Sequence, residues 1–182
     1  MKRIYAVLDI GSTTLKLLVA ELMSTNINIL FTKKLASHAI EDGLITNEDV
    51  LVDEIRSIIK DADEELNTTI KSVALVLPSN YARTYNSKGI TKVNSPHDKI
   101  EVDDVVRALK IAQYFEKSKK EEIVSTIPVK YQLDTREVDC IPLGMRSASL
   151  KVETMVITTN KKMLYAYLTA VEKAGLEVLD IT

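Results

Sequence analysis

A run of hydroxyl and charged side chains near the start of the chain has the composition of a phosphate-binding loop. Glycine permits a tight turn, while hydroxyls and backbone N–H groups can enclose an anion. A carboxylate repels phosphate unless a divalent cation lies between them, so Asp9 suits a hydrated Mg²⁺. We therefore predict that this loop binds a nucleotide and that Asp9 holds the metal indirectly, through water. The predicted binding residues are Asp9, Gly11, Ser12, Thr13, Thr14 and Lys16.

The residues around this loop predict the strands that position it. Ile4 to Leu8 forms a buried-strand pattern, and two further apolar runs, 15–22 and 27–31, are separated by the polar turn 24–26 (Ser24-Thr25-Asn26). The spacing is neither that of a Walker loop nor that of a Rossmann fingerprint. A second interpretation is an ordinary hairpin in which the serine and threonines serve only the turn.

Composition limits the class of protein. The chain has 182 residues, 46% of them hydrophobic, and a formal net charge of −2, which predicts a soluble globular protein with no nucleic-acid surface. Its single cysteine excludes an internal disulfide, and no signal peptide or membrane-spanning run is evident, so the cytoplasm is expected. Cys140, His38 and His97 are interpreted as core or surface residues, because a zinc site would require unusual additional ligands.

The rest of the first half predicts a helix followed by a strand. Thr46 or Asn47 can cap a helix, and Val73 to Leu77 follows as a buried strand. Strand, strand, strand, helix, strand is the order of an α/β protein with a mixed sheet. The apolar helix positions are Val50, Leu51, Ile55, Ile58, Ile59, Ala62 and Leu66.

The pattern changes near Tyr81, where we place a subdomain boundary. A helix is predicted over Glu101–Lys117, with the basic run 117–120 as its solvated end. Strands are predicted over 123–133 and 138–152, with Pro128 and Pro142 at edges or bulges. The apolar face of the helix is assigned to Val102, Val105, Val106, Leu109 and Ala112. This middle stretch is expected to be a small α+β unit.

The last part of the chain returns to the first pattern. A strand is predicted over Thr154–Thr159, followed by a helix that Asn160 caps and Gly175 ends. Residues 176–182 begin another strand, so we expect the lobe to be incomplete at the end of this sequence.

Several separated motifs together resemble the FtsA family of actin-like bacterial cell-division proteins, in register over the whole chain. The loop Asp9–Lys16 is similar to the family's first phosphate loop, and Asp42-Gly43-Leu44-Ile45 is similar to its entry to the long helix. The inserted subdomain and the following helix are represented by Tyr85–Gly89, Ile141–Arg146 with Leu150–Glu153, and Val171–Val178.

The resemblance implies a partial actin-like, ribonuclease H-like lobe with an inserted small α+β subdomain. Residues 1–80 and 155–182 would form the lobe, and residues 81–154 the FtsA-type insertion. It also implies ATP with Mg²⁺ in the full-length protein, bound in a cleft between lobes. Asp9 would act near the metal, Gly11 to Thr14 near the β- and γ-phosphates, and Lys16 on the phosphates. Because this chain would form only one half of the cleft, we expect it to bind ATP weakly or not at all. No catalytic residue is assigned in this chain.

The partners that the resemblance implies are FtsZ, other division proteins and further copies of the same protein in a filament. Membrane attachment would come from a C-terminal helix outside these residues, at the cytoplasmic face of the division septum. In the insertion, an exposed strand face or edge near Tyr131 to Asp139 is one possible contact.

Three alternatives remain open at this point. A sugar kinase or a radical-enzyme activator of the same superfamily begins with a similar loop, although the activator needs cysteines for an iron–sulfur cluster. A pilus-assembly adaptor of related architecture carries the same kind of insertion. The stretch Pro142-Leu143-Gly144-Met145 is not explained by the kinase or the activator.

Overall fold

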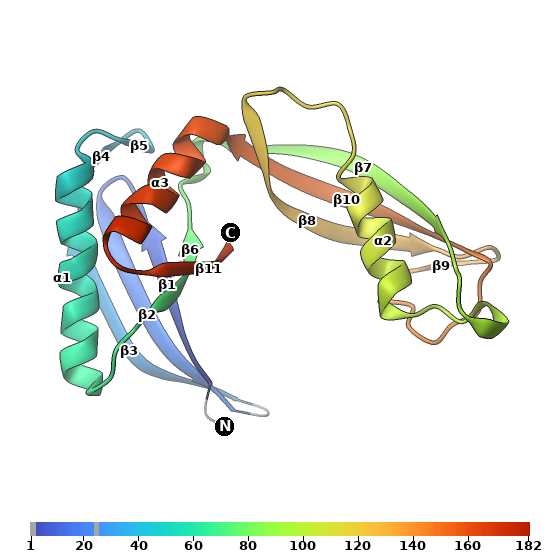
Figure 1. Cartoon of the computed structure of the whole chain (residues 1–182), viewed down its shortest axis with the longest axis horizontal. Coiled ribbons are helices and arrows are strands. Elements are labelled where there is room, and N and C mark those ends of the chain that lie inside the picture. The colour runs from blue at the N-terminus through green and yellow to red at the C-terminus, as the bar shows by residue number, and fades with distance from the viewer. Residues whose placement is uncertain (1–2, 24–25) are drawn as a thin grey trace. The chain divides into compact units, whose positions relative to one another are not determined.

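The structure is a computed structural model that describes residues 3–23 and 26–182. The chain divides into two compact units, one of Met1–Ala82 with Asn160–Thr182 and one of Arg83–Thr159 (Figure 1). The sequence placed the subdomain boundaries after residues 80 and 154, close to these divisions. We call the two the loop unit, which contains Asp9 to Lys16, and the inserted unit.

The loop unit is built on a mixed five-stranded sheet in the order β11-β6-β1-β2-β3. Strand β1 pairs antiparallel with β2 and parallel with β6, and β11 is parallel to β6. The predicted strand order and mixed sheet are confirmed, while Ser24 and Thr25 of the predicted turn lie outside the described residues. The strands are β1 (Arg3–Ile10), β2 (Thr14–Leu22), β3 (Ile27–Ala36), β6 (Ser72–Val76) and β11 (Glu177–Ile181).

Two helices of the loop unit begin at asparagine caps. Asn47 accepts a hydrogen bond from the Val50 N–H at the start of α1 (Glu48–Leu66), and Asn160 does the same for the Met163 N–H in α3 (Lys161–Lys173). Gly175 follows α3 with φ +95°, a conformation that favours glycine at a helix end. A small hairpin, β4 (Ile40–Glu41) and β5 (Leu44–Ile45), precedes α1.

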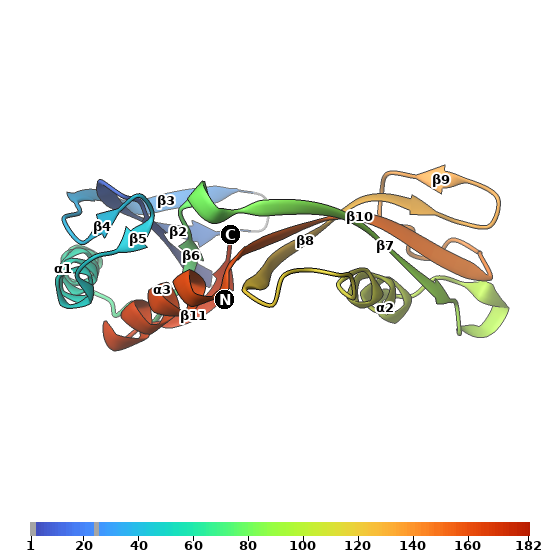
Figure 2. The same ribbon diagram turned by 90° about the horizontal axis from the view of Figure 1, so that it is seen from above.

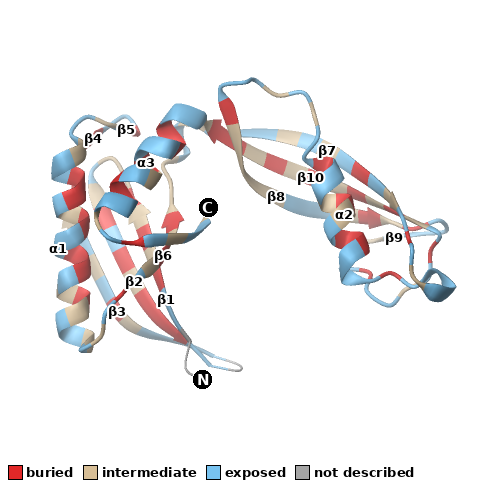
Figure 3. Ribbon diagram, in the orientation of Figure 1, coloured by how far each residue is buried: buried red, intermediate tan, exposed pale blue. Residues whose placement is uncertain are grey.

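The core of the loop unit lies on the helix-covered face of the sheet. Leu8, Ile10 and Leu17 are fully or almost fully buried there with side chains of α1 and α3. The alternate residues Tyr5 and Leu22 are 43% and 47% exposed on the opposite face. Figures 2 and 3 show this division between a helical layer and an open sheet face, and the alternation of buried and exposed residues along the strands.

The inserted unit is a four-stranded sheet with one helix. The strand order is β7-β10-β8-β9, and β7 pairs antiparallel with β10 over its length. A short 3-10 helix of the loop unit, Ser79–Tyr81, lies just before β7 in the chain. Another 3-10 helix, Pro96–Asp98, lies before α2 in the inserted unit. The elements of the unit are β7 (Arg83–Lys92), α2 (Val102–Ala112), β8 (Glu121–Gln132), β9 (Glu137–Val138) and β10 (Ser149–Asn160).

Helix α2 packs closely on β7 at a glycine. A Cβ added to Gly89 would lie 1.8 Å from the Ala108 carbonyl oxygen and 2.8 Å from the Ala112 nitrogen. The buried residues of α2 are Asp104, Val105, Ala108 and Ala112, and the two alanines are the ones that Gly89 approaches. The predicted stripe was partly wrong, because Val102 and Val106 are 60% and 41% exposed.

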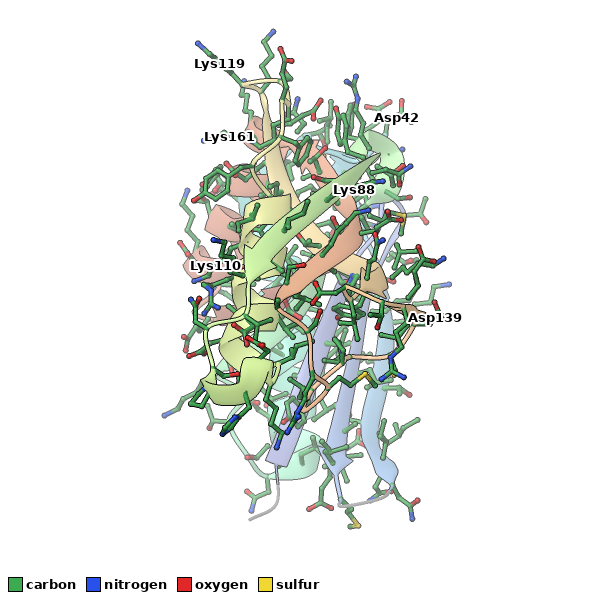
Figure 4. The ribbon with its side chains drawn as sticks, turned by 90° about the vertical axis from the view of Figure 1, so that its right-hand side faces the viewer. Asp42, Lys88, Lys110, Lys119, Asp139 and Lys161 are labelled. Atoms are coloured by element: carbon green, nitrogen blue, oxygen red, sulfur yellow. The ribbon has the colours of Figure 1, made fainter. Side chains whose placement is uncertain are left out.

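Helix α2 is also shorter than the predicted range of 101–117. It ends at Ala112, and the Tyr114 side chain beyond it is 87% exposed. Beyond Ala112 the chain leaves the helix, and the Phe115 ring packs against the Tyr85 ring of β7 with 5.1 Å between the ring centroids. The run 117–120 is consequently a loop before β8 and not a helix end, and Figure 4 shows Lys119 at its tip.

The strand predicted over 138–152 is instead the end of the short strand β9, an irregular segment and, from Ser149, the start of β10. Pro142 lies in that segment, and Gly144 adopts φ +76°. The segment bonds to the chain around Ile100, through Gly144 N to Ile100 O at 2.9 Å and Ile100 N to Met145 O at 2.8 Å. Strand β10 then continues unbroken to Asn160, so the separate strand predicted from Thr154 is its second half.

We predict that Gly89→Ala destabilises the inserted unit by about 3 kcal/mol or more, because the new methyl group overlaps helix backbone that cannot move alone. Urea unfolding of the chain measures this change. Lys88→Ala is the matched control, since Lys88 is the neighbouring residue and its side chain is 60% exposed. Equal stability of Gly89→Ala and the parent chain would contradict the close approach.

Candidate functional site

The predicted loop connects β1 and β2 as a tight hairpin. Asp9 and Lys16 are opposite each other in the strand register, and Lys16 Nζ lies 2.7 Å from Asp9 Oδ2. The two side chains are 53% (Lys16) and 33% (Asp9) exposed, so their pairing is accessible to solvent. A surface ion pair of this kind is weak and can be exchanged for contacts with a charged ligand.

Backbone hydrogen bonds fix the tip of the hairpin. The Gly11 N–H donates to the Thr14 carbonyl at 3.0 Å, and the Thr13 carbonyl accepts from the Ser37 N–H at 3.0 Å. A Cβ at Gly11 would lie 3.1 Å from the Thr14 oxygen, which explains the small residue there. Ser12 and Thr13 lie between the strand ends, outside the β1–β2 pairing, so their amides can face an anion.

Ser12 is held from the side by the β4–β5 hairpin. Its Oγ accepts a hydrogen bond from the Gly43 N–H at 3.2 Å. The carbonyl of Gly43 in turn accepts from the Tyr167 hydroxyl at 3.1 Å. Asp42 and Gly43 have φ values of 49° and 76°, as in the two-residue turn that an Asp-Gly pair favours.

A cavity of about 420 Å³ borders the Asp9–Lys16 pair. Val7 and Leu18 supply apolar lining, and Lys34 adds a second exposed cation from β3. The Asp9 carboxylate and the lysines Lys16, Lys33 and Lys34 line this cavity, and they are a suitable donor and acceptor set for a phosphate chain that carries Mg²⁺. The residues present therefore fit the group that the sequence predicts.

The other candidate residues lie apart from this loop. His38 is exposed and its backbone N–H donates to Glu54, while His97 occupies a left-handed turn. Cys140 is exposed in the inserted unit. Within residues 3–23 and 26–182, no three histidine, cysteine or acidic side chains gather as a metal-binding group.

The inserted unit contains two strongly buried carboxylates, Asp104 and Glu121, which are 3% and 7% exposed. Glu121 accepts hydrogen bonds from Tyr85 at 2.9 Å and Thr158 at 3.1 Å, and Arg83 pairs with it at 3.1 Å. Burial of a charge requires such partners, and here they tie β7, β8 and β10 together. The set is satisfied internally, so it stabilises the sheet and offers no binding site.

The suggested contact region from Tyr131 to Asp139 is only partly exposed. Tyr131 is buried in the core of the inserted unit, at 2% exposure, and pairs with Val138 of β9. Strand β9 is the edge of the sheet. The edge is therefore available, whereas the Tyr131 side chain is not.

The sequence interpretation overlooked Gly43 as a partner of Ser12 and Tyr167 as a partner of Gly43. The Asp-Gly pair between Ile40 and Leu44 is a strong hairpin signal and could have revealed the turn. No pattern in the sequence indicates the contact with Tyr167, because 124 positions separate it from Gly43.

Comparison with known proteins agrees with this architecture. The profile of the SHS2 domain inserted in FtsA matches residues 79–158. In a solved PilM–PilN type IV pilus biogenesis complex, one chain superposes with a TM-score of 0.61 at 15% identity, covering 97% of this chain and 46% of that chain. The fold is therefore that of an actin-like ATPase lobe with an SHS2 insertion.

The sequence relatives specify the family. FtsA of Bacillus subtilis (strain 168) is 30% identical over 98% of this chain and 40% of its own length. FtsA of Streptococcus pneumoniae serotype 2 is 29% identical over 96% of this chain and 38% of its own length. The chain is similar to FtsA cell division proteins over nearly its whole length, and the predicted resemblance to the N-terminal part of FtsA is confirmed. It spans about 40% of the length of the B. subtilis relative.

No helix among the described residues is long and apolar enough to span a membrane.

We predict that Tyr167→Phe destabilises the loop unit by about 1–3 kcal/mol at neutral pH, because it leaves the buried Gly43 carbonyl without its donor. Burial, with a smaller contribution from Tyr81, raises the pKa of Tyr167 to about 12. An unfolded tyrosine ionises near pH 10, so the parent chain loses stability as pH rises from about 10 to about 12.

Denaturant titrations at several pH values measure both effects. The difference in unfolding free energy between the parent chain and Tyr167→Phe should shrink between pH 10 and 12, because phenylalanine has no proton to lose. Tyr165→Phe is the control, because Tyr165 lies on the same helix and is 50% exposed. A constant deficit across this pH range would contradict the buried hydroxyl.

Proposed function

We propose that this chain supplies one wall of an ATP site in a bacterial cell division protein that resembles FtsA. The observation that supports this most strongly is the pair of Asp9 and Lys16 beside the open amides of the β1–β2 hairpin. The chain is similar to FtsA cell division proteins, and the loop is the part of it that has phosphate-binding chemistry.

Each residue of the hairpin has a distinct role in the proposal. Lys16 exchanges its ion pair with Asp9 for a phosphate oxygen, and Asp9 then orients water around Mg²⁺. Gly11 provides the turn, while Ser12, Thr13 and Thr14 offer hydroxyl and amide donors to the β- and γ-phosphates. When bound together with ATP, Mg²⁺ would neutralise part of the phosphate charge.

The chain is proposed to have no ATPase activity of its own. A phosphate wall without an adenosine pocket and an opposing lobe makes only part of the contacts that affinity requires. We expect weak or absent ATP binding by the chain itself, and Mg²⁺-dependent binding by a longer polypeptide that adds a second actin-like lobe.

The inserted unit is proposed to provide protein contacts. As in FtsA, the partners would be FtsZ, other division proteins and neighbouring copies in a filament, with membrane attachment by a C-terminal helix outside these residues. The expected location is the cytoplasmic face of the membrane at the division septum, and no nucleic-acid partner is proposed.

A pilus-assembly adaptor is the second candidate. The superposition on the PilM–PilN complex covers almost the whole chain, which supports this alternative at the level of fold. The higher identity to FtsA, 30% against 15%, favours the division role.

Isothermal titration calorimetry with Mg²⁺ and ATP tests the nucleotide proposal. We predict measurable binding for a longer polypeptide with a second lobe and little or none for this chain. Chelation of Mg²⁺ should weaken binding, because Asp9 then faces phosphate without an intervening cation. Tight Mg²⁺-dependent binding by the chain alone, or no binding by the longer polypeptide, would contradict the proposal.

In the longer polypeptide, Asp9→Ala and Lys16→Ala should each reduce ATP affinity by about 10- to 100-fold, since each removes a charged contact or a metal-orienting group. Lys60→Ala is the matched control, because its side chain is 75% exposed and pairs only along α1 with Glu64. Unchanged affinity in both loop variants would place the nucleotide elsewhere.

A further inference from the structure

Gly43 contacts three segments that are far apart in the sequence. Its N–H donates to Ser12 Oγ in the phosphate loop, at 3.2 Å. Its carbonyl accepts from the Tyr167 hydroxyl of α3, at 3.1 Å. A Cβ added to it would lie 3.2 Å from the Cγ and Oδ1 atoms of Asn80, so the Asn80 side chain lies against its backbone.

Two of these segments connect the two units of the chain. Asn80 belongs to the 3-10 helix Ser79–Tyr81, and β7 of the inserted unit begins at Arg83. Tyr167 belongs to α3, which begins at Lys161, directly after β10 returns from the inserted unit. The chain therefore leaves for the inserted unit just after one segment that contacts Gly43, and it returns directly into another.

The β4–β5 hairpin is well suited to transmit a displacement. Ile40 pairs with Ile45 and Glu41 with Leu44, around a turn with positive φ at both central residues. Its far end is fixed by hydrogen bonds from the Thr46 and Asn47 N–H groups to the Ala39 carbonyl. The conformation of this short hairpin is therefore restrained at both its turn and its base.

We propose that the hairpin Ile40–Ile45 couples the phosphate loop to the two connections that lead to the inserted unit. Tyr167 is a positioning residue in this coupling, since it acts on the loop through Gly43. The inference rests on the proposed role of the loop as the phosphate site. It adds a route by which occupancy of that site changes the segments that carry the inserted unit.

The hydrogen-bond directions give the coupling a physical basis. Ser12 Oγ accepts the Gly43 N–H, so its own hydrogen is directed elsewhere and can be donated to an anion. Donation to a phosphate oxygen polarises the hydroxyl and strengthens the bond from Gly43. The effect is reciprocal, because a change at Tyr167 that shifts Gly43 must also change the affinity of the loop for phosphate.

Amide hydrogen exchange on the ligand-free chain tests the coupling first. Relative to the core amides of β1, Tyr167→Phe should speed exchange by about tenfold at Gly43 and residues 79–82, the cost of one lost buried hydrogen bond. Ser12→Ala should do the same at Gly43 and residues 79–82. Thr13→Ala is the control, because Thr13 is an exposed hydroxyl at the same turn.

Two outcomes of this experiment would overturn the proposal. One is exchange at residues 79–82 that does not respond to either variant. The other is a uniform increase over the whole loop unit, which would assign Tyr167 a purely structural role. Neither outcome depends on whether the chain binds nucleotide.

A second comparison uses the longer polypeptide with Mg²⁺ and ATP. Nucleotide should slow exchange at residues 79–82 in the parent polypeptide by several-fold and leave it unchanged in Tyr167→Phe. Retained protection in Tyr167→Phe would reject the hairpin as the route. If the parent polypeptide binds no ATP, the proposed function fails, whereas the ligand-free experiment still decides the coupling.

Discussion

The turn at Asp42 and Gly43 is the constraint on which the arrangement of the loop unit depends. Both residues have positive φ, and Gly43 is buried, with its N–H and its carbonyl both committed to other segments. A buried peptide group without partners is costly, so Ser12 and Tyr167 must lie where they do for the unit to be stable. The geometry of the phosphate loop is thereby tied to the packing of α3.

The inserted unit depends on a different kind of constraint. Gly89 lets α2 approach β7 until backbone meets backbone, and the buried carboxylate of Glu121 joins three strands through its donors. These contacts lie within the unit itself. The sheet face away from α2 carries charged side chains instead, among them the ion pair of Lys88 and Glu153. Lys88 is labelled in Figure 4.

The sequence predicted the elements whose causes are local. Short apolar runs gave the strands of the loop unit, and the caps at Asn47 and Asn160 and the stop at Gly175 are each set by nearby residues. The end of α2 and the segment after β9 were predicted wrongly, because both regions make tertiary contacts that no local pattern indicates, Phe115 with Tyr85 and Gly144–Met145 with Ile100. The loop residues were proposed correctly as a hairpin, and their role in binding ATP stays a prediction.

Paramagnetic relaxation by Mn²⁺ with ATP would locate the phosphate site, in a longer polypeptide that includes this chain and a second lobe. The effect falls steeply with distance from the metal. We predict the strongest broadening at the amides of Asp9 to Thr13, with a weaker effect at Gly43. Bound Mn²⁺–ATP that leaves these amides sharp would contradict the assignment of the hairpin as the phosphate site.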